Sequence, residues 1–287
     1  MKQQYLRTIY FLVFLVSPSL LLAADESSPE NIKMQMDGKE QQSADKNSYQ
    51  VTSPVVGFSP LTVGGEQIDA AYIEESYGER KGVVVLFHDQ GEQFESNGVI
   101  TPLRHALPEF GWSTLSISLD LSFESNILLS ARLEKMESGD EAEPVKTPQP
   151  VLNEQRIAAA LSFLKGKDFE RIIFIGHGQG GGLAFESLQN NSENIAALVL
   201  ISTAEIAKQE EFNLLELPIL DVLGSRDLTG IEQAVAQRKV MMKRNSEANY
   251  TARKIIGANH VYYGLEPMLI STLRGWLKTQ FDQQGQN

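Results

Sequence analysis

The sequence contains no cysteine. That absence excludes disulfide bonds, thiolate metal ligands, a cysteine nucleophile and a lipid-modified cysteine anchor. It leaves the compartment open, because a chain without thiols is compatible with an oxidising or a reducing environment. Basic residues are also scarce, with 25 Lys and Arg against 37 Asp and Glu and a formal net charge of −12. The charge balance argues against nucleic acid or an anionic membrane face as the main partner.

The composition is that of a globular protein. The chain has 287 residues, of which 42% are hydrophobic and 22% charged. This is not the polar, aromatic-poor composition of a disordered chain. The length is enough for one or two domains with a core of useful size.

The N-terminus predicts export. Lys2 and Arg7 form a short basic segment, and residues 9–22 are almost wholly apolar before the small residues at 23 and 24. This pattern is typical of a secretory signal peptide over residues 1–24, with an uncleaved anchor as the alternative. The polar residues 25–50 predict a flexible linker. We expect an exported protein, periplasmic in a Gram-negative source, with no membrane span after signal cleavage.

Residues 51–287 predict an α/β domain. Buried strands are expected from runs of β-branched and apolar residues, and helices from apolar side chains at helical spacing. Strands are expected at 67–73, 82–87, 112–119, 172–175, 195–201, 218–223 and 252–256, and helices near 100–107, at 153–165, at 179–188, near 231–242 and from 267 onward. This alternation predicts a mostly parallel central sheet flanked by helices.

One long segment interrupts the alternation. Residues 120–150 hold seven acidic and three basic residues together with three prolines. The segment is too long for an ordinary connection between a strand and a helix. We interpret it as an acidic insertion after an early strand, either solvated or acting as a lid over a site at the strand ends.

The most informative stretch is Gly176-His177-Gly178-Gln179-Gly180, which lies between a predicted strand and a predicted helix. This context is that of the nucleophile elbow G-x-S-x-G, in which a sharp turn presents a side chain above the sheet. The central residue here is Gly178, which has no side chain to present. For His177 we favour a satisfied polar residue at a strand end.

At this point the chain resembles the α/β-hydrolase superfamily, over nearly all of residues 65–281. The resemblance implies that Gly178 occupies the nucleophile position, that Asp227 is the acid and that His260 is the base, as remnants of a catalytic triad. It also implies oxyanion-hole amides near His88 and at Gln179. The strings Phe87-His88-Asp89-Gln90-Gly91 and Gly257-Ala258-Asn259-His260 further resemble an exported bacterial family of unknown function within that superfamily, and Asp89 is assigned with His88 to the pocket.

Other chemistries fit less well. A nucleotide site would need the Lys-Ser/Thr of a P-loop or the G-x-G-x-x-G spacing, and the sequence has neither here. A metal site built from the three histidines and Asp227 is conceivable, but no metal-ligand spacing supports it, so we expect neither a metal nor a cofactor. Ser202 and Asp89 are alternative nucleophiles by position alone, and for Ser202 we favour a cap at the end of a strand. His105, within a helix, is expected at the surface.

Three functional hypotheses follow. The first is a catalytically degenerate α/β-hydrolase-fold protein that binds a small ligand or an envelope partner through the inherited cleft, and this is the one we favour. The second is a weak or atypical ester or amide hydrolase that uses His260 and Asp227 with water or another nucleophile. The third is an envelope assembly factor that docks a partner through the acidic insertion.

Overall fold

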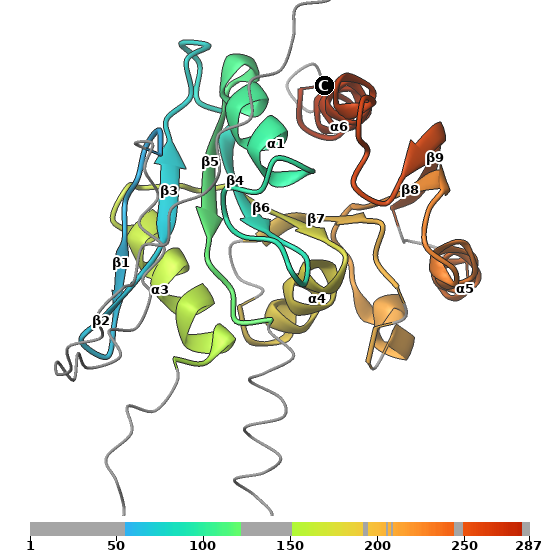
Figure 1. The fold of residues 1–287 in the computed structure, drawn as a ribbon, viewed down its shortest axis with the longest axis horizontal. Coiled ribbons are helices and arrows are strands. Elements are labelled where there is room, and N and C mark those ends of the chain that lie inside the picture. The colour runs from blue at the N-terminus through green and yellow to red at the C-terminus, as the bar shows by residue number, and fades with distance from the viewer. Residues whose placement is uncertain are drawn as a thin grey trace, which may run out of the picture. The chain divides into compact units, whose positions relative to one another are not determined.

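β-branched and apolar runs form a seven-stranded sheet in the computed structural model, which describes residues 55–121, 151–191, 195–243 apart from 205 and 208, and 249–282. The strand order is β3-β5-β4-β6-β7-β8-β9, and β3 is antiparallel to its neighbour while the others run parallel (Figure 1). The bounds are β3 (Ala70–Ile73), β4 (Gly82–Phe87), β5 (Trp112–Ile117), β6 (Ile172–His177), β7 (Ile195–Ile201), β8 (Ile219–Arg226) and β9 (Tyr250–Asn259).

Helices cover both faces of this sheet. One apolar core includes side chains of α3 and α4, and the other includes side chains of α1 and α6. The helices are α1 (Ile100–Ala106), η1 (Leu107–Phe110), α3 (Asn153–Lys165), α4 (Gln179–Asn191), η3 (Gln209–Leu214), α5 (Ile231–Met242) and α6 (Glu266–Phe281). The predicted α/β class with a mostly parallel sheet is therefore confirmed.

The expected elements are largely present, with one difference near the start. The predicted helix at 153–165 and strand at 195–201 have the predicted bounds. The single strand expected at 67–73 is instead two strands. Residues of β2 (Glu66–Ile68) pair with β1 (Leu61–Val63) in a separate two-stranded sheet, whereas β3 pairs with β5. The residues predicted to be a signal peptide and a linker, and nearly all of the predicted acidic insertion, lie outside the described residues.

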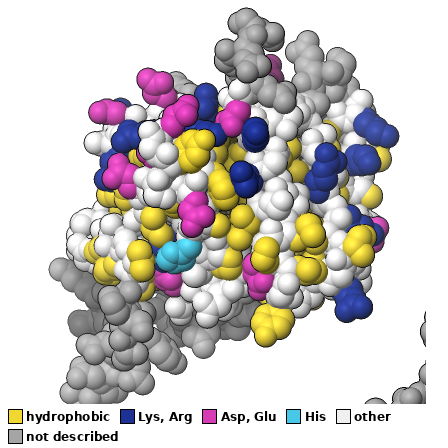
Figure 2. Space-filling model, turned by 90° about the horizontal axis from the view of Figure 1, so that it is seen from above, with side chains coloured by type: hydrophobic (Ala, Val, Ile, Leu, Met, Phe, Trp, Pro, Cys, Tyr) yellow, Lys and Arg dark blue, Asp and Glu magenta, His cyan; other side chains and the backbone are white. Residues whose placement is uncertain are grey.

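The described surface mixes charges of both signs. Seen from above, acidic, basic and hydrophobic side chains are interspersed over one face, with Lys and Arg more frequent toward one side (Figure 2). His105 is exposed in the last turn of α1, as expected. Among the described residues, no helix has both the length and the apolar character that a membrane crossing requires.

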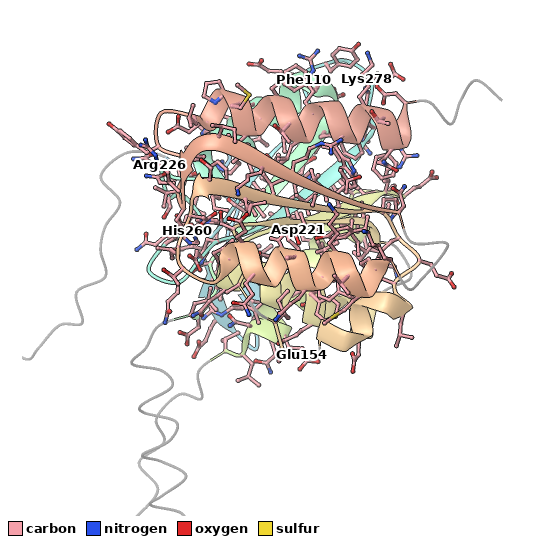
Figure 3. All side chains as sticks on the ribbon, turned by 90° about the vertical axis from the view of Figure 1, so that its right-hand side faces the viewer. Phe110, Glu154, Asp221, Arg226, His260 and Lys278 are labelled. Carbon is pink, nitrogen blue, oxygen red and sulfur yellow. The ribbon has the colours of Figure 1, made fainter. Side chains whose placement is uncertain are left out.

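A buried ion pair supports the loop after β7. Asp221 in β8 and Arg238 in α5 are both fully buried, with Nε of Arg238 2.7 Å from Oδ2 of Asp221. The Tyr250 hydroxyl also donates to Asp221, at 2.7 Å. Arg238 further donates to the carbonyl oxygens of Thr203 and Ala204, each at 2.8 Å. Asp221 lies in the interior, whereas Arg226 and His260 lie at one end of the molecule (Figure 3).

Candidate functional site at the strand ends

The chain turns sharply at Gly178, between the end of β6 at His177 and the start of α4 at Gln179. Gly178 adopts a positive φ of 53°, a conformation that favours glycine. Its N–H donates to the carbonyl oxygen of Ile201 at 2.9 Å, which fixes the turn against β7. At Gly180 a side chain would strike the carbonyl oxygens of Phe87 and His88, so glycine allows α4 to approach β4 closely.

The space above Gly178 is filled by another residue. A Cβ atom at Gly178 would overlap the carboxyl carbon and both carboxylate oxygens of Asp89. Asp89 follows β4, and its Oδ1 accepts the backbone N–H of Gln179 at 2.7 Å. Its Oδ2 lies 2.9 Å from Nε2 of His260. A carboxylate from a neighbouring loop therefore occupies the space that a side chain at residue 178 would need.

His260 bridges two carboxylates. Nδ1 lies 2.7 Å from Oδ1 of Asp227, and Nε2 lies 2.9 Å from Oδ2 of Asp89. Burial raises the pKa of Asp89 and of Asp227, but the hydrogen bonds to each outweigh burial and lower it below its usual value. Both groups are therefore ionised carboxylates that only accept hydrogen bonds, so both ring nitrogens of His260 donate and the ring is an imidazolium. Burial lowers the pKa of His260, but the hydrogen bonds and charges of the two aspartates outweigh burial and raise it to about 9.

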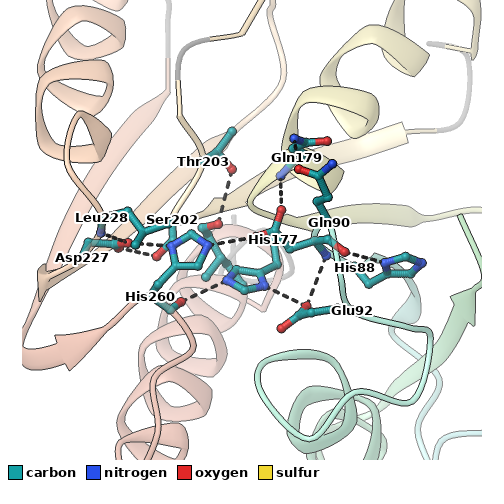
Figure 4. A network of polar contacts seen from close by, with 12 residues as sticks. His88, Gln90, Glu92, His177, Gln179, Ser202, Thr203, Asp227, Leu228 and His260 are labelled. Carbon is teal, nitrogen blue, oxygen red and sulfur yellow. Dashed lines mark hydrogen bonds and ion pairs between the residues drawn. The ribbon is translucent and has the colours of Figure 1, made fainter. Parts of the chain in front are cut away.

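Asp227 is held by several donors at the end of β8. The N–H groups of Gly224 and Leu228 donate to its two oxygens at 3.0 and 2.9 Å. The hydroxyl of Ser202 donates to the same carboxylate (Figure 4). Burial raises the pKa of Asp227, but the hydrogen bonds from His260, Ser202 and the backbone together lower it below its usual value. Asp227 therefore remains an ionised partner of His260.

Ser202 supports Asp227 through a hydrogen bond to its carboxylate. It is fully buried, has a positive φ of 48°, and its hydroxyl contacts Asp227 and the Tyr262 hydroxyl, the latter at 3.1 Å. Burial raises the pKa of Tyr262. The Ser202 hydroxyl is directed at the Asp227 carboxylate and not at the His260 ring. The structure therefore places Ser202 as a support for Asp227 and not as a nucleophile.

His88 and His177 are structural. Nδ1 of His88 donates to the carbonyl of Asp89 at 2.8 Å, and Nε2 accepts the N–H of Leu119 at 2.9 Å. Burial lowers the pKa of His88, which keeps the ring neutral. Nδ1 of His177 lies 3.0 Å from Glu92, and Nε2 donates to the carbonyl oxygen of His260 at 3.0 Å. Through these contacts both side chains hold the loops that carry the site residues.

A metal ion fits this arrangement poorly. Asp89, His177 and His260 offer ligand atoms within 4.8 Å of one another, whereas Asp227 is not part of that group. Both nitrogens of His177 already have partners, a carbonyl oxygen and the Glu92 carboxylate. A metal ligand needs a free lone pair directed at the ion. Binding through His177 would therefore require breaking one of these contacts.

Glu92 is a site residue that the sequence analysis missed. Its carboxylate lies beside the fully buried His177 and accepts the Asp89 N–H at 3.2 Å. Burial raises the pKa of Glu92, and its contacts with His177 and the Asp89 N–H outweigh burial and lower it. Glu92 and His177 are 85 residues apart, so no local spacing indicates this pair.

Comparisons with known proteins agree with the fold. A family model described as a protein of unknown function (DUF3530) matches residues 6–279. None of the curated proteins matches the chain. A putative α/β hydrolase of unknown function from Agrobacterium tumefaciens is similar in structure, with TM-score 0.59 and 14% identity over 79% of this chain and 97% of that one.

Two further solved structures are similar. A dienelactone hydrolase from Anabaena variabilis has TM-score 0.56 and 18% identity over 78% of this chain and 97% of that one. Est1E from Butyrivibrio proteoclasticus has TM-score 0.58 and 15% identity over 78% and 98%. At these identities the likeness establishes the α/β-hydrolase fold and leaves the activity to the residues of the site.

Proposed function

Because the chain belongs to the DUF3530 family of proteins of unknown function and has the α/β-hydrolase fold, we propose that it is an exported protein that has lost serine-type hydrolysis and binds a small ligand or an envelope partner. The observation that carries this proposal is the overlap between a Cβ at Gly178 and the Asp89 carboxyl group. The position where the fold would present a nucleophile lacks its hydroxyl and is filled by a charged group.

The protonation of the site also opposes ester and amide hydrolysis. In serine-type catalysis a neutral imidazole takes the proton of the attacking hydroxyl. Here both nitrogens of His260 donate to carboxylates, so the ring has no lone pair ready to accept a proton. The same argument opposes direct attack by water activated by His260. Asp89 also occupies the Gln179 N–H, which would otherwise stabilise the oxyanion.

Two exposed apolar side chains, close in sequence to Asp227 and His260, support a binding function. Leu228 directly follows Asp227 and is 59% exposed, and Tyr263 lies three residues beyond His260 and is 82% exposed. Each follows a residue of the Asp227–His260 pair on its loop, so both side chains are available for contact with a ligand or partner. The proposed exported location rests on the sequence. The basic and apolar pattern of residues 2–24 supports it. Fractionation of cells that produce the full chain with a C-terminal tag tests that location.

We expect the unaltered protein to hydrolyse para-nitrophenyl acetate at the rate of the buffer alone. The physical reason is the lack of both a hydroxyl nucleophile and a neutral base at His260. Release of para-nitrophenol, followed by absorbance at neutral pH, measures the rate. The variant His260→Ala is expected to give the same background rate.

His105→Gln is the matched control, because His105 is an exposed histidine on α1 whose Nε2 contacts Arg104 and not the aspartates that hold His260. A robust rate in the unaltered protein that survives in His105→Gln and disappears in His260→Ala would show that the site performs ester hydrolysis. The proposal of catalytic degeneracy would then be wrong.

A further inference from the structure

The two edges of the central sheet differ in how they are covered. β3 forms one edge and has four residues, and the segment before β1 bonds to it. The N–H of Ser59 donates to the carbonyl oxygen of Ala70 at 2.9 Å, and the N–H of Tyr72 donates at 2.8 Å to that of Gly57. β9 forms the other edge, has ten residues, and pairs with β8 alone among the described strands. A long edge strand without such a cover is a template for pairing with another chain.

Every second residue of β9 has its backbone directed away from β8. The carbonyl oxygen of Asn249 accepts the N–H of Ile219. The N–H of Gly257 donates to the hydroxyl of Ser225. Both contacts join odd-numbered residues to β8, and in a parallel pair the residues that bond to the neighbour alternate along the strand. The N–H and C=O groups of the even-numbered residues from 252 to 256 therefore face the open side of the sheet, where an added strand can bond to them.

The side chains along this edge are basic and apolar. Arg253 and Lys254 are exposed, and Ile256 is 78% exposed. Nζ of Lys254 lies 2.6 Å from Oε1 of Glu232. The guanidinium of Arg253 contacts the Ala252 carbonyl oxygen at 3.3 Å and, within the described part of the chain, no carboxylate. The edge therefore offers a positive charge that the protein itself does not neutralise.

This positive charge belongs to a wider asymmetry of the chain. Residues 219–282 hold nine Lys and Arg against six Asp and Glu, although the whole chain holds 25 against 37. Lys and Arg are more frequent in Figure 2 on the side where Figure 1 places β9. The β9 side is thus a basic surface on an acidic protein, and it is complementary to an acidic partner.

We propose that the outer edge of β9 is a docking site for an extended acidic segment of a partner protein, which joins the sheet as a further strand. Backbone hydrogen bonds to the even-numbered residues supply affinity, and acidic side chains beside Arg253 and Lys254 supply specificity. An apolar side chain of the partner covers Ile256. The inference goes beyond the proposed function, because residues 252–256 make none of the contacts described for the site and docking there does not depend on what the site binds.

Charge opposes a second copy of this chain as the occupant. If two copies paired β9 with β9 about a two-fold axis at the middle of the strand, Arg253 and Lys254 would lie close to the same residues of the other copy. Like charges that face each other across strands are destabilising. An acidic strand meets opposite charges at the same positions. These two side chains therefore oppose self-association at this edge and favour an acidic partner.

The test uses the full chain and a peptide matched in length to the ten residues of β9, with glutamate at every second position and threonine or valine between. We expect the peptide to bind and to slow amide exchange at Ala252, Lys254 and Ile256, because their N–H groups become hydrogen-bonded. The N–H groups of Arg253 and Ile255, which are directed at β8, should change little. Amide NMR measures exchange residue by residue, and fluorescence anisotropy of the labelled peptide measures affinity.

Charge reversal makes the test specific. Arg253→Glu should weaken binding at least about fivefold, because it replaces an attraction to the peptide with a repulsion. Added salt should weaken binding to the unaltered protein, since it screens exposed charges. Lys165→Glu is the matched control, because Lys165 is an exposed lysine on α3, which packs on β1 and β5 toward the opposite edge of the sheet. This control should bind the peptide as tightly as the unaltered protein does.

Three results with the folded, unaltered protein would overturn the inference: no binding, equal binding of a peptide with lysine in place of glutamate, or binding that leaves the β9 amides unprotected. A dimer in sedimentation, with the same amides protected before any peptide is added, would assign the edge to a second copy and would also overturn it. Hydrolysis of para-nitrophenyl acetate through His260 would refute the proposed function alone, because none of these measurements involves the site.

Discussion

The double variant Gly178→Ser with Asp89→Ala is expected to hydrolyse para-nitrophenyl acetate at least about 100-fold faster than the unaltered protein. Removing the Asp89 carboxylate clears the space that the introduced serine side chain needs. It also frees the Gln179 N–H as an oxyanion donor and leaves Nε2 of His260 facing the new hydroxyl. The pKa of His260 should fall, because one of its two carboxylate partners is gone.

The single variants make this prediction specific. Gly178→Ser alone should stay at background, because its side chain competes with Asp89 for the same space. Asp89→Ala alone should also stay at background, since it has no hydroxyl nucleophile. Para-nitrophenol release by the four proteins, with circular dichroism to confirm folding, measures the effect. Equal rates in all four folded proteins would contradict the geometry described for this site.

Raising the pH from about 6 to about 10 is expected to remove on the order of 3 kcal/mol of stability through His260. The folded state raises the pKa of His260 from 6.5 to about 9. A raised histidine pKa stabilises the folded state fully below the unfolded value, and this contribution is lost as pH rises from about 6.5 to about 9. Urea unfolding across this range measures the change in the free energy of unfolding.

Other groups also titrate at alkaline pH, so the test compares the pH-dependent loss in the free energy of unfolding between variants. His260→Gln should flatten the loss between neutral and alkaline pH, whereas His105→Gln should retain it. His105 provides the comparison because it is exposed on α1. A loss of the same size in His260→Gln would show that His260 is not the group responsible, and that its two carboxylate contacts do not hold the proton.

The sequence predicts the fold well because local patterns encode it. The apolar run of residues 82–87 forms β4 with the expected bounds, and the helical spacing of residues 153–165 forms α3. The single strand expected at 67–73 is two strands, because both halves have strand character and only pairing with different partners separates β2 from β3. Such pairing depends on distant residues, which single-sequence patterns do not contain.

The sequence predicts which residues belong to the site but not all of the contacts between them. The order of Gly178, Asp227 and His260 along the chain indicates a triad-like arrangement, and the structure brings Asp227 and His260 within hydrogen-bond distance. The overlap of Asp89 with the Gly178 side-chain position depends on how the loop after β4 folds across the turn. That path is held by contacts such as Glu92 with His177, which join residues far apart in the sequence.

Nitrogen NMR of the His260 ring tests the central claim most directly. In uniformly labelled protein at neutral pH, both ring nitrogens should carry protons, and the ring should titrate with a pKa of about 9. In Asp89→Asn the same ring should titrate at lower pH, because Asp89 no longer contributes its charge. A His260 ring with one unprotonated nitrogen at neutral pH, and a titration unchanged by Asp89→Asn, would contradict the account.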